Sequence, residues 1–293
     1  MKGVATEHGL RQHFELVAAR ALDEDLGGPD AEADVTTTTV VPDRTWAAAV
    51  VTSKAAGVVC GLEALDATYG ALDPRVAVTH ELADGDEVVV GDVVARVRGP
   101  ARAILTGERS ALNVMRHLSG IATLVRAFVT RAPGVQITET RKTTPGLRAL
   151  EKYAVRAAGG SNHRFALYDG VLIKDNHIVA AGSVAEAVRR AKRSTTLTIE
   201  VECTSVGEVD EAIDEGADEI LLDNLDPGQL AELVAHIWKR SSDVVIEASG
   251  NVTLDNVEAV AATGVDRISV GAFTHSAPAL DLSLTIEKVW EEA

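Results

Sequence analysis

The chain has 293 residues and a formal net charge of −16; 46% of its residues are hydrophobic but only 3% are aromatic. Such an acidic exterior disfavours binding to DNA, RNA or anionic membranes. The length allows one large domain or two ordinary ones, and a core built from Ala, Val, Leu and Ile is typical of α/β proteins with buried parallel strands.

Neither the N-terminal residues nor the spacing of the cysteines indicates a secreted protein. Polar residues follow Lys2 where a signal peptide needs an apolar run, and no apolar segment is long enough to span a bilayer. Cys60 and Cys203 match no metal or redox spacing. We therefore expect a cytoplasmic protein with both thiols reduced.

The first 131 residues mix helical and strand-like segments. Apolar spacing predicts helices at 8–26 and 62–72, and one or two helices over 103–131, broken near Gly120. The Thr-rich stretch 33–42 is expected to be a loop. Strands are predicted at 46–61, 87–90 and 93–97.

Beyond Pro133 the pattern becomes a repeated β–α alternation, which implies parallel strands with right-handed crossovers. The predicted strands are 135–141, 171–174, 197–203, 219–223, 244–248 and 267–270, and the helices are 146–158, 183–193, 205–215, 227–239 and 253–263. No G-x-G-x-x-G follows the first strand, which counts against a dinucleotide-binding sheet. In chain order the strands finish with Arg141-Lys142, Lys174-Asp175-Asn176, Glu202, Asp223-Asn224, Ser249-Gly250 and Gly271, and a β/α barrel would gather these ends at one mouth.

Seven of the 28 lysines and arginines fall between Arg141 and Lys174, opposed only by Glu151 and Asp169. This local reversal of sign predicts a pocket for a small polyanion. Arginine forks suit carboxylates, and lysines suit pyrophosphate or a second carboxylate. We expect Arg141, Lys142, His163, Arg164 and Lys174 in the pocket. The helically spaced Arg148, Lys152 and Arg156 are expected to form a solvated face instead.

Strand period places Glu200 and Glu202 on the inner face of one strand, where a buried carboxylate needs a cation, donors or a metal. Glu200 is expected to form a structural ion pair, with Lys142, Lys174 or Mg²⁺ as partners to consider. Glu202, nearer the mouth, is expected to be functional. Asp223 ends the next strand and suits a ribose hydroxyl or hydrated Mg²⁺, since Asp226 is better placed to cap the following helix.

Glycine-containing turns end the last two strands. Ser249, Gly250 and Asn251 precede a helix, and Val270, Gly271 and Ala272 follow the final strand. Glycine lets backbone N–H groups approach an anion, and barrels often bind phosphate in these last two loops. One such loop could be an ordinary turn, but two in these positions predict a phosphate site.

Several ordered blocks resemble the quinolinate phosphoribosyltransferase family, also called nicotinate-nucleotide pyrophosphorylase (carboxylating). They run over much of the chain: GERSALN at 107–113, TRKTTPGLR at 140–148, NHR at 162–164, LIKDNH at 172–177, LLDN at 221–224, EASG at 247–250 and SVGAFTHS at 269–276. The resemblance implies that quinolinate and phosphoribosyl pyrophosphate, with Mg²⁺, give nicotinate mononucleotide, pyrophosphate and CO₂ for NAD biosynthesis.

The resemblance also implies an architecture. An N-terminal α/β sandwich is expected over 1–118, an incomplete β/α barrel of about six parallel strands over 119–280, and a C-terminal segment 281–293 that returns to the first domain. The implied active unit is a homodimer, which could assemble further, and in it Arg109 of one subunit reaches the quinolinate bound to the other.

The same resemblance assigns roles to the residues of the predicted pocket. Thr140, Arg141, His163, Arg164 and Lys174 match the substrate-binding set, and Lys142 lies near both ligands. Glu202 and Asp223 match acids on the ribose and metal side, directly or through water. Residues 249–251 and 270–272 match the 5-phosphate loops. Lys142, Lys174, Glu202 and Asp223 are the expected catalytic residues.

Three positions depart from the family pattern, which often has Asp at Glu139, Val at Cys203 and Gly at Asn251. Only Asn251 touches a proposed contact, and Asn tolerates left-handed backbone better than most residues.

Other interpretations remain open at this point. One is a barrel aldolase with Lys174 as Schiff-base amine. Another is a phosphoribosyltransferase-like protein of molybdate uptake loci with a different substrate. A third is a phosphosugar or nucleotide sensor without catalysis, against which the paired acids argue.

Overall fold

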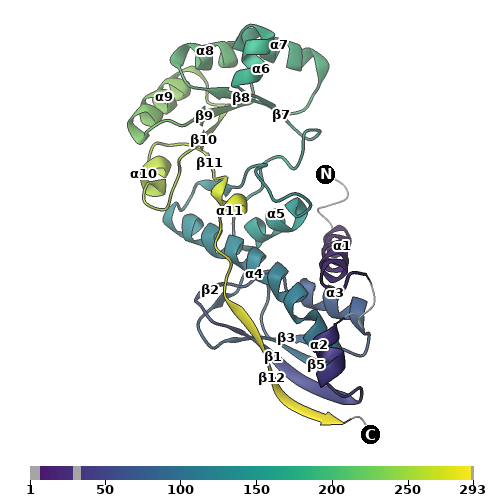
Figure 1. Cartoon of the computed structure of the whole chain (residues 1–293). Coiled ribbons are helices and arrows are strands. Elements are labelled where there is room, and N and C mark those ends of the chain that lie inside the picture. Colours follow the sequence, from purple (N-terminus) through teal and green to yellow (C-terminus); the bar gives the residue numbers. More distant parts are fainter. Residues whose placement is uncertain (1–6, 29–33, 292–293) are drawn as a thin grey trace. The chain divides into compact units, whose positions relative to one another are not determined.

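The computed structural model describes residues 7–28 and 34–291 (Figure 1). Ala33 of the predicted loop and residues 292–293 of the predicted C-terminal segment lie outside these ranges. The chain divides into two compact units. Unit 1 comprises residues 1–126, 143–159 and 276–293, and unit 2 comprises 127–142 and 160–275. The domain boundaries drawn from the sequence stay a prediction beside this division.

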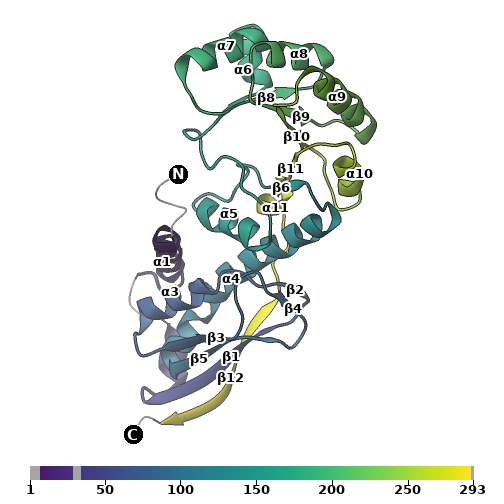
Figure 2. The ribbon, with the colours of Figure 1, turned by 180° about the vertical axis from the view of Figure 1, so that it is seen from behind.

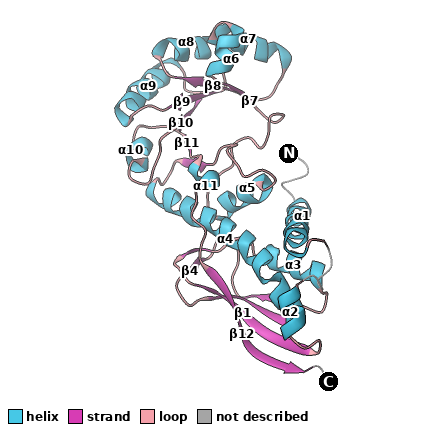
Figure 3. Ribbon diagram, in the orientation of Figure 1, coloured by secondary structure: helices cyan, strands magenta, loops and turns pink. Residues whose placement is uncertain are grey.

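Unit 1 contains an antiparallel sheet in the order β12-β1-β5-β3. Its strands are β1 (Thr45–Ser53), β3 (Ala77–His80), β5 (Val93–Pro100) and β12 (Leu282–Glu291), and β12 pairs along the whole of β1 (Figure 3). A separate two-stranded sheet joins β2 (Gly57–Val58) and β4 (Glu87–Val88). The helices are α1 (Glu7–Leu26), α2 (Val35–Val40), α3 (Glu63–Leu72), α5 (Arg148–Ala157) and the first part of α4 (Ala101–Arg131).

Three predictions for this half were wrong in detail. The Thr-rich stretch forms α2, because the Asp34 carboxylate caps it by accepting the Thr37 N–H. The strand predicted over 46–61 is split between β1 and β2. The long helix α4 has no break at Gly120, where the absence of a side chain serves a close backbone approach.

Unit 2 contains six parallel strands in the order β6-β11-β10-β9-β8-β7. They are β6 (Gln136–Thr138), β7 (Val171–Ile173), β8 (Ile199–Cys203), β9 (Glu219–Asp223), β10 (Val245–Ser249) and β11 (Arg267–Ser269). Within unit 2 the first strand, β6, pairs with the last, β11, as in a β/α barrel. The strands β6 and β7 lie at the two ends of the sheet order. The expected incomplete barrel of six parallel strands is confirmed.

Helices cover the outer side of these strands (Figures 1 and 2). They are α7 (Val184–Ser194), α8 (Val206–Asp214), α9 (Pro227–Arg240) and α10 (Val257–Ala261), while the short α6 (Asp175–Ala181) packs beside α7 and the short α11 (Ala272–His275) follows the end of β11. Short α6 and α11 were not predicted. Alternate strand residues such as Ile199, Val201 and Cys203 are fully buried, which leaves the intervening side chains for the barrel interior.

The sequence predicted a helix cap at Asp226 and a solvated helix face that includes Lys152. Asp226 caps α9, where its carboxylate accepts the N–H groups of Gly228 and Gln229, as expected. Lys152 was assigned to a solvated face, but it is only 1% exposed, so this side of α5 is buried, together with Ala149 and Glu151. No helix in the described ranges is both long and apolar enough to cross a bilayer.

Candidate active site

A cavity of about 660 Å³ opens at the carboxyl ends of the unit 2 strands. It is large enough for two small ligands of the size typical of enzyme pockets. Apart from Arg109, every site residue chosen from the sequence lines it: Thr140, Arg141, Lys142, His163, Arg164, Lys174, Glu202, Asp223, Ser249, Gly250, Asn251, Val270, Gly271 and Ala272.

Arg109 is the exception among the predicted residues. It lies on α4 in unit 1, its side chain is 54% exposed, and its guanidinium is 3.4 Å from the Glu108 carboxylate. The cavity lining within a single copy does not include it.

Two arginines form a basic wall of the cavity. The Nε atom of Arg141 is buried and has no hydrogen-bond partner in the described structure. Burial, followed by the nearby charge of Arg141, lowers the pKa of Arg164, whose Nη1 donates to the carbonyl of Gly170 at 3.0 Å. A buried donor without an acceptor is costly, and so is a pair of like charges, so this wall is complementary to a carboxylate ligand.

Opposite charges meet across β7, β8 and β9. The Lys174 ammonium is 2.9 Å from a Glu202 carboxylate oxygen. Burial and the charge of Glu202 raise the pKa of Asp223, and the charges of Lys174 and Lys142 oppose that rise. An ion-paired ammonium is not the free amine that a Schiff-base mechanism requires, so the geometry disfavours the aldolase interpretation.

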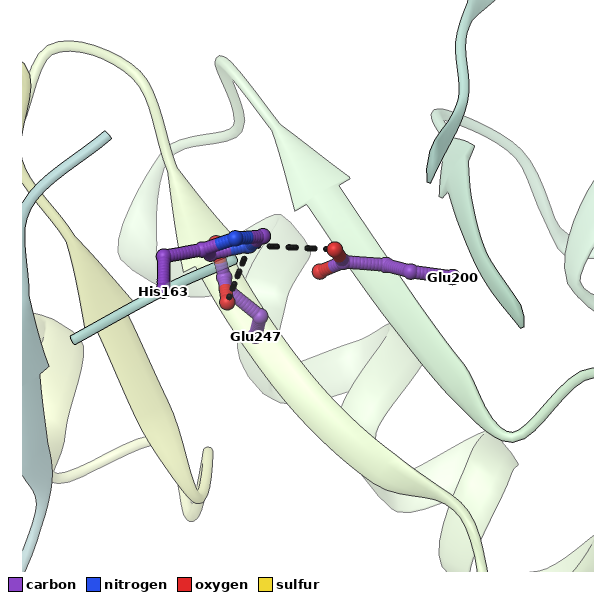
Figure 4. A group of neighbouring side chains, drawn as sticks. All are labelled: His163, Glu200 and Glu247. Carbon is purple, nitrogen blue, oxygen red and sulfur yellow. Dashed lines mark ion pairs between the residues drawn. The ribbon is translucent and has the colours of Figure 1, made fainter. Parts of the chain in front are cut away.

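A second polar cluster lies deeper in the barrel (Figure 4). Nε2 of His163 is 3.0 Å from Glu200 and 3.5 Å from Glu247, and both carboxylates are buried. Arg267 pairs with Glu200 at 3.4 Å and also contacts Glu219 and Glu247. Glu200 is therefore held in a structural ion pair, as predicted, but its partners are His163 and Arg267 rather than the two lysines considered.

Burial and neighbouring charges have opposite effects on the pKa values of the groups in this cluster. Burial raises the pKa of Glu200, but the hydrogen bond and charge of His163, with Arg267, bring it below its ordinary value. Burial and the charge of Glu200 raise the pKa of Glu247. Burial lowers the pKa of His163, yet the two carboxylates bring it above its ordinary value; its Nδ1 meanwhile accepts the Arg164 N–H at 2.8 Å.

This cluster also bears on metal binding. Ligand atoms of His163, Glu200 and Glu247 lie within 4.8 Å of one another, a spacing that could hold a cation. Arg267 already places a positive guanidinium among these carboxylates. Positive charge at this point therefore comes from arginine, and the pair Glu202 and Asp223 at the mouth is the better set of oxygen donors for Mg²⁺.

Sequence reasoning missed Glu247 and Ser269 of the cavity, and it named Asn224 at a strand end without assigning it a role. Asn224 immediately follows the predicted Asp223, and Glu247 occupies an inward position on β10 like that of Glu200 on β8. The alternation of polar and apolar residues within each strand was the available signal. Arg267 gave none, because its role depends on which strands become neighbours.

Comparison with known proteins agrees with this geometry. Residues 34–119 match the family model for the N-terminal domain of quinolinate phosphoribosyl transferase, and residues 121–285 match the model for its C-terminal domain. A probable nicotinate-nucleotide pyrophosphorylase [carboxylating] from Bacillus subtilis is 42% identical over 282 residues, covering 94% of this chain and 92% of the relative.

The human nicotinate-nucleotide pyrophosphorylase [carboxylating] is also 42% identical, over 240 residues and 80% of each chain. The solved structure of nicotinate-nucleotide pyrophosphorylase from Francisella tularensis superposes with a TM-score of 0.87 at 34% identity, covering 94% of this chain and 97% of that one. The chain belongs to the quinolinate phosphoribosyl transferase family.

Proposed function

We propose that this chain transfers the phosphoribosyl group of phosphoribosyl pyrophosphate to quinolinate and releases CO₂. The products are nicotinate mononucleotide and pyrophosphate, which places the reaction in NAD biosynthesis. The enzyme is thus a nicotinate-nucleotide diphosphorylase (carboxylating), a pentosyltransferase. Family membership over both domains supports this assignment.

One observation carries the choice of substrate. Arg141 presents a buried Nε donor without an acceptor, beside the like charge of Arg164. A dianionic pyridine dicarboxylate supplies acceptors and relieves the repulsion in a single binding step. Arginine forks hold each carboxylate in a defined plane, so the ring nitrogen can be directed at the sugar.

The reaction balances without a covalent enzyme intermediate. The ring nitrogen forms a bond to C1 of the ribose while the bond from C1 to pyrophosphate breaks, and pyrophosphate leaves with the electron pair. The nitrogen is then cationic, so the adjacent carboxylate leaves as CO₂, and its ring carbon keeps the electrons and takes up a proton. Lys142 and Lys174 stabilise charge on the leaving group, and Glu202 and Asp223 face the electron-poor sugar carbon.

Glu202 and Asp223 fit a requirement for Mg²⁺. The two acids are close enough for the charge of Glu202 to raise the pKa of Asp223, and a divalent cation with phosphate oxygens would relieve that repulsion. Bound there, directly or through water, Mg²⁺ would neutralise pyrophosphate charge. Removal of divalent cations with EDTA should abolish turnover, and titration with MgCl₂ should restore it; turnover that survives EDTA would contradict this role.

A homodimer completes the site in this proposal. The family resemblance assigns Arg109 to the quinolinate of a partner subunit, and its side chain is 54% exposed on α4, as donation to another copy requires. Cys60 and Cys203 are both buried thiols without a disulfide, in keeping with a reducing compartment such as the cytoplasm.

The decisive assay measures pyrophosphate and CO₂ together. Purified protein is incubated with phosphoribosyl pyrophosphate, MgCl₂ and carboxyl-labelled quinolinate, and nicotinate serves as the control acceptor. We expect equal molar release of both products with quinolinate and none with nicotinate. Pyrophosphate release from nicotinate without CO₂ would replace the substrate, and failure with both acceptors would remove the proposal.

A further inference from the structure

Two asparagines share an uncommon backbone conformation at the rim of the cavity. Asn224 and Asn251 have φ angles of 57° and 54°, and they are the non-glycine residues with positive φ in the described structure. Both line the cavity, and they follow β9 and β10, which are neighbouring strands. Such backbone persists at functional sites when surrounding contacts hold it in place.

Hydrogen bonds connect these residues in series. Nδ2 of Asn251 donates to Oδ1 of Asn224 at 3.1 Å, and Nδ2 of Asn224 donates to Oδ2 of Asp223 at 2.5 Å. From the other side, Nδ2 of Asn256 donates to the carbonyl oxygen of Asn251 at 3.0 Å. The series runs from the turn after β10 to the acid that ends β9.

The direction of this series is fixed by charge. An ionised carboxylate only accepts hydrogen bonds, so the amide of Asn224 must turn its NH₂ group toward Asp223. Its carbonyl oxygen then faces Asn251, which must donate. The orientation of the Asn251 amide is therefore set by Asp223, two hydrogen bonds away.

Gly250 makes room for the arrangement. A Cβ atom at this position would lie 2.2 Å from Oδ1 of Asn224 and 2.9 Å from its backbone nitrogen. The Asn224 N–H also donates to the carbonyl of Ser249 at 2.9 Å. The Asn224 side chain thus lies directly on the backbone of the 249–251 turn, and Asn251 holds it there.

We propose that Asn251 is a positioning residue for the sugar-phosphate substrate, and that it acts through Asn224 on Asp223. The inference rests on the proposed function, in which 249–251 contacts the 5-phosphate and Asp223 faces the ribose. The relay holds these two contacts at a fixed separation before the ligand arrives. Preorganisation of this kind strengthens binding by reducing the ordering that the ligand must impose.

Glycine substitutions isolate the side chains, because glycine adopts positive φ without strain. In Asn251→Gly we expect the KM for phosphoribosyl pyrophosphate to rise about threefold to tenfold, the range of one hydrogen bond. The KM for quinolinate and the melting temperature should stay at wild-type values, because the Asn251–Asn224 bond is exposed and involves neither Arg141 nor Arg164. An unchanged KM for phosphoribosyl pyrophosphate would overturn the proposal.

A double-mutant cycle distinguishes the relay from a direct contact between Asn251 and phosphate. If Asn251 acts through Asn224, the Asn251→Gly change adds nothing to Asn224→Gly, and the double variant matches Asn224→Gly alone. If the two fold-changes multiply, Asn251 acts independently and the relay is wrong.

Calorimetry with ribose 5-phosphate separates this idea from the proposed reaction. Weaker binding to Asn251→Gly than to wild type, with no further loss when Asn251→Gly is added to Asn224→Gly, supports the relay even if quinolinate turnover fails. Equal binding by both proteins, or none by either, rejects the relay even if turnover succeeds.

Discussion

At the scale of single residues, the cavity is organised by incomplete charge pairing. Lys174 has Glu202 as a partner, and Arg267 has three carboxylates, but the basic wall has the unpartnered Nε of Arg141 next to Arg164. In the free protein these two cations repel each other and one donor lacks an acceptor, and a bound dianion would relieve both costs. Cations that already have carboxylate partners stabilise the barrel, whereas the two arginines of the basic wall are available to a ligand.

The first prediction concerns those two arginines. Arg141→Ala and Arg164→Ala should each weaken quinolinate binding about 10- to 100-fold, the range expected for hydrogen bonds to charged groups. Arg141→Ala should not lower the melting temperature, because it removes one of two like charges, whereas Arg164→Ala also loses the hydrogen bond to the Gly170 carbonyl and should lower it slightly. Isothermal titration with quinolinate checks affinity, and Arg240→Ala, an exposed arginine on α9 paired with Asp214, is the matched control. Unaltered affinity in both cavity variants would refute the assignment.

At the scale of elements, α2 depends on its cap. The Asp34 carboxylate accepts the Thr37 N–H at 3.0 Å and the Thr106 hydroxyl at 2.9 Å. Burial raises the pKa of Asp34, but the hydrogen bonds from Thr37 and Thr106 outweigh burial and leave it below its ordinary value of 3.8. A depressed carboxyl pKa contributes stability that is present above the unfolded value and is lost as pH falls through the folded value.

The second prediction follows from the lowered pKa of Asp34. At pH 7, Asp34→Ala should reduce the free energy of unfolding by about 1 kcal/mol, as loss of a helix cap does. The difference from wild type should shrink as the pH falls below the ordinary value of 3.8. Urea unfolding at several pH values measures it, with the change at an exposed residue, Asp255→Ala, as control. A difference that stays constant with pH would contradict the role of the ionised carboxylate.

The third prediction concerns Gly120 in α4. Alanine favours helix over glycine, yet a Cβ at Gly120 would lie 2.1 Å from the carbonyl oxygen of Pro278. Gly120→Ala should therefore destabilise the protein by about 1–3 kcal/mol, the usual cost of overpacking. A Cβ at Gly207 in α8 would have no atom within 4 Å, so Gly207→Ala should be neutral or stabilising. Thermal unfolding of both variants tests the contrast, and equal effects would disprove it.

The elements predicted well are those whose signal is local. The strand β9 lies at 219–223, where an apolar run followed by Asp-Asn predicted it, and α7 to α9 lie within two residues of their predicted ranges. The cap that makes α2 a helix also holds Thr106 of α4, and the glycine in α4 fits Pro278, far away in sequence. Arg267 similarly contacts carboxylates from three other positions of the barrel. Such pairings depend on tertiary neighbours, which a local pattern does not contain.

At the scale of the whole molecule, the acidic chain concentrates cations where strand ends converge. The net charge of −16 contrasts with a cavity that contains Arg141, Lys142, Arg164 and Lys174. In the proposed dimer one further cation, Arg109, comes from the second copy. The side chain of Arg109 is 54% exposed, so this proposal can be tested by function.

The last prediction uses subunit complementation. Arg109→Ala and Lys174→Ala homodimers should each be strongly impaired, since every site lacks one cation. In a mixed dimer with Arg109 acting across the interface, one of the two sites has both residues intact. Random mixing gives about half mixed dimers, so an equimolar co-refolded sample should recover about a quarter of wild-type activity. If Arg109 acts within its own copy, every site in the mixed dimer lacks one residue, and activity no higher than the mean of the two homodimers would exclude donation between subunits.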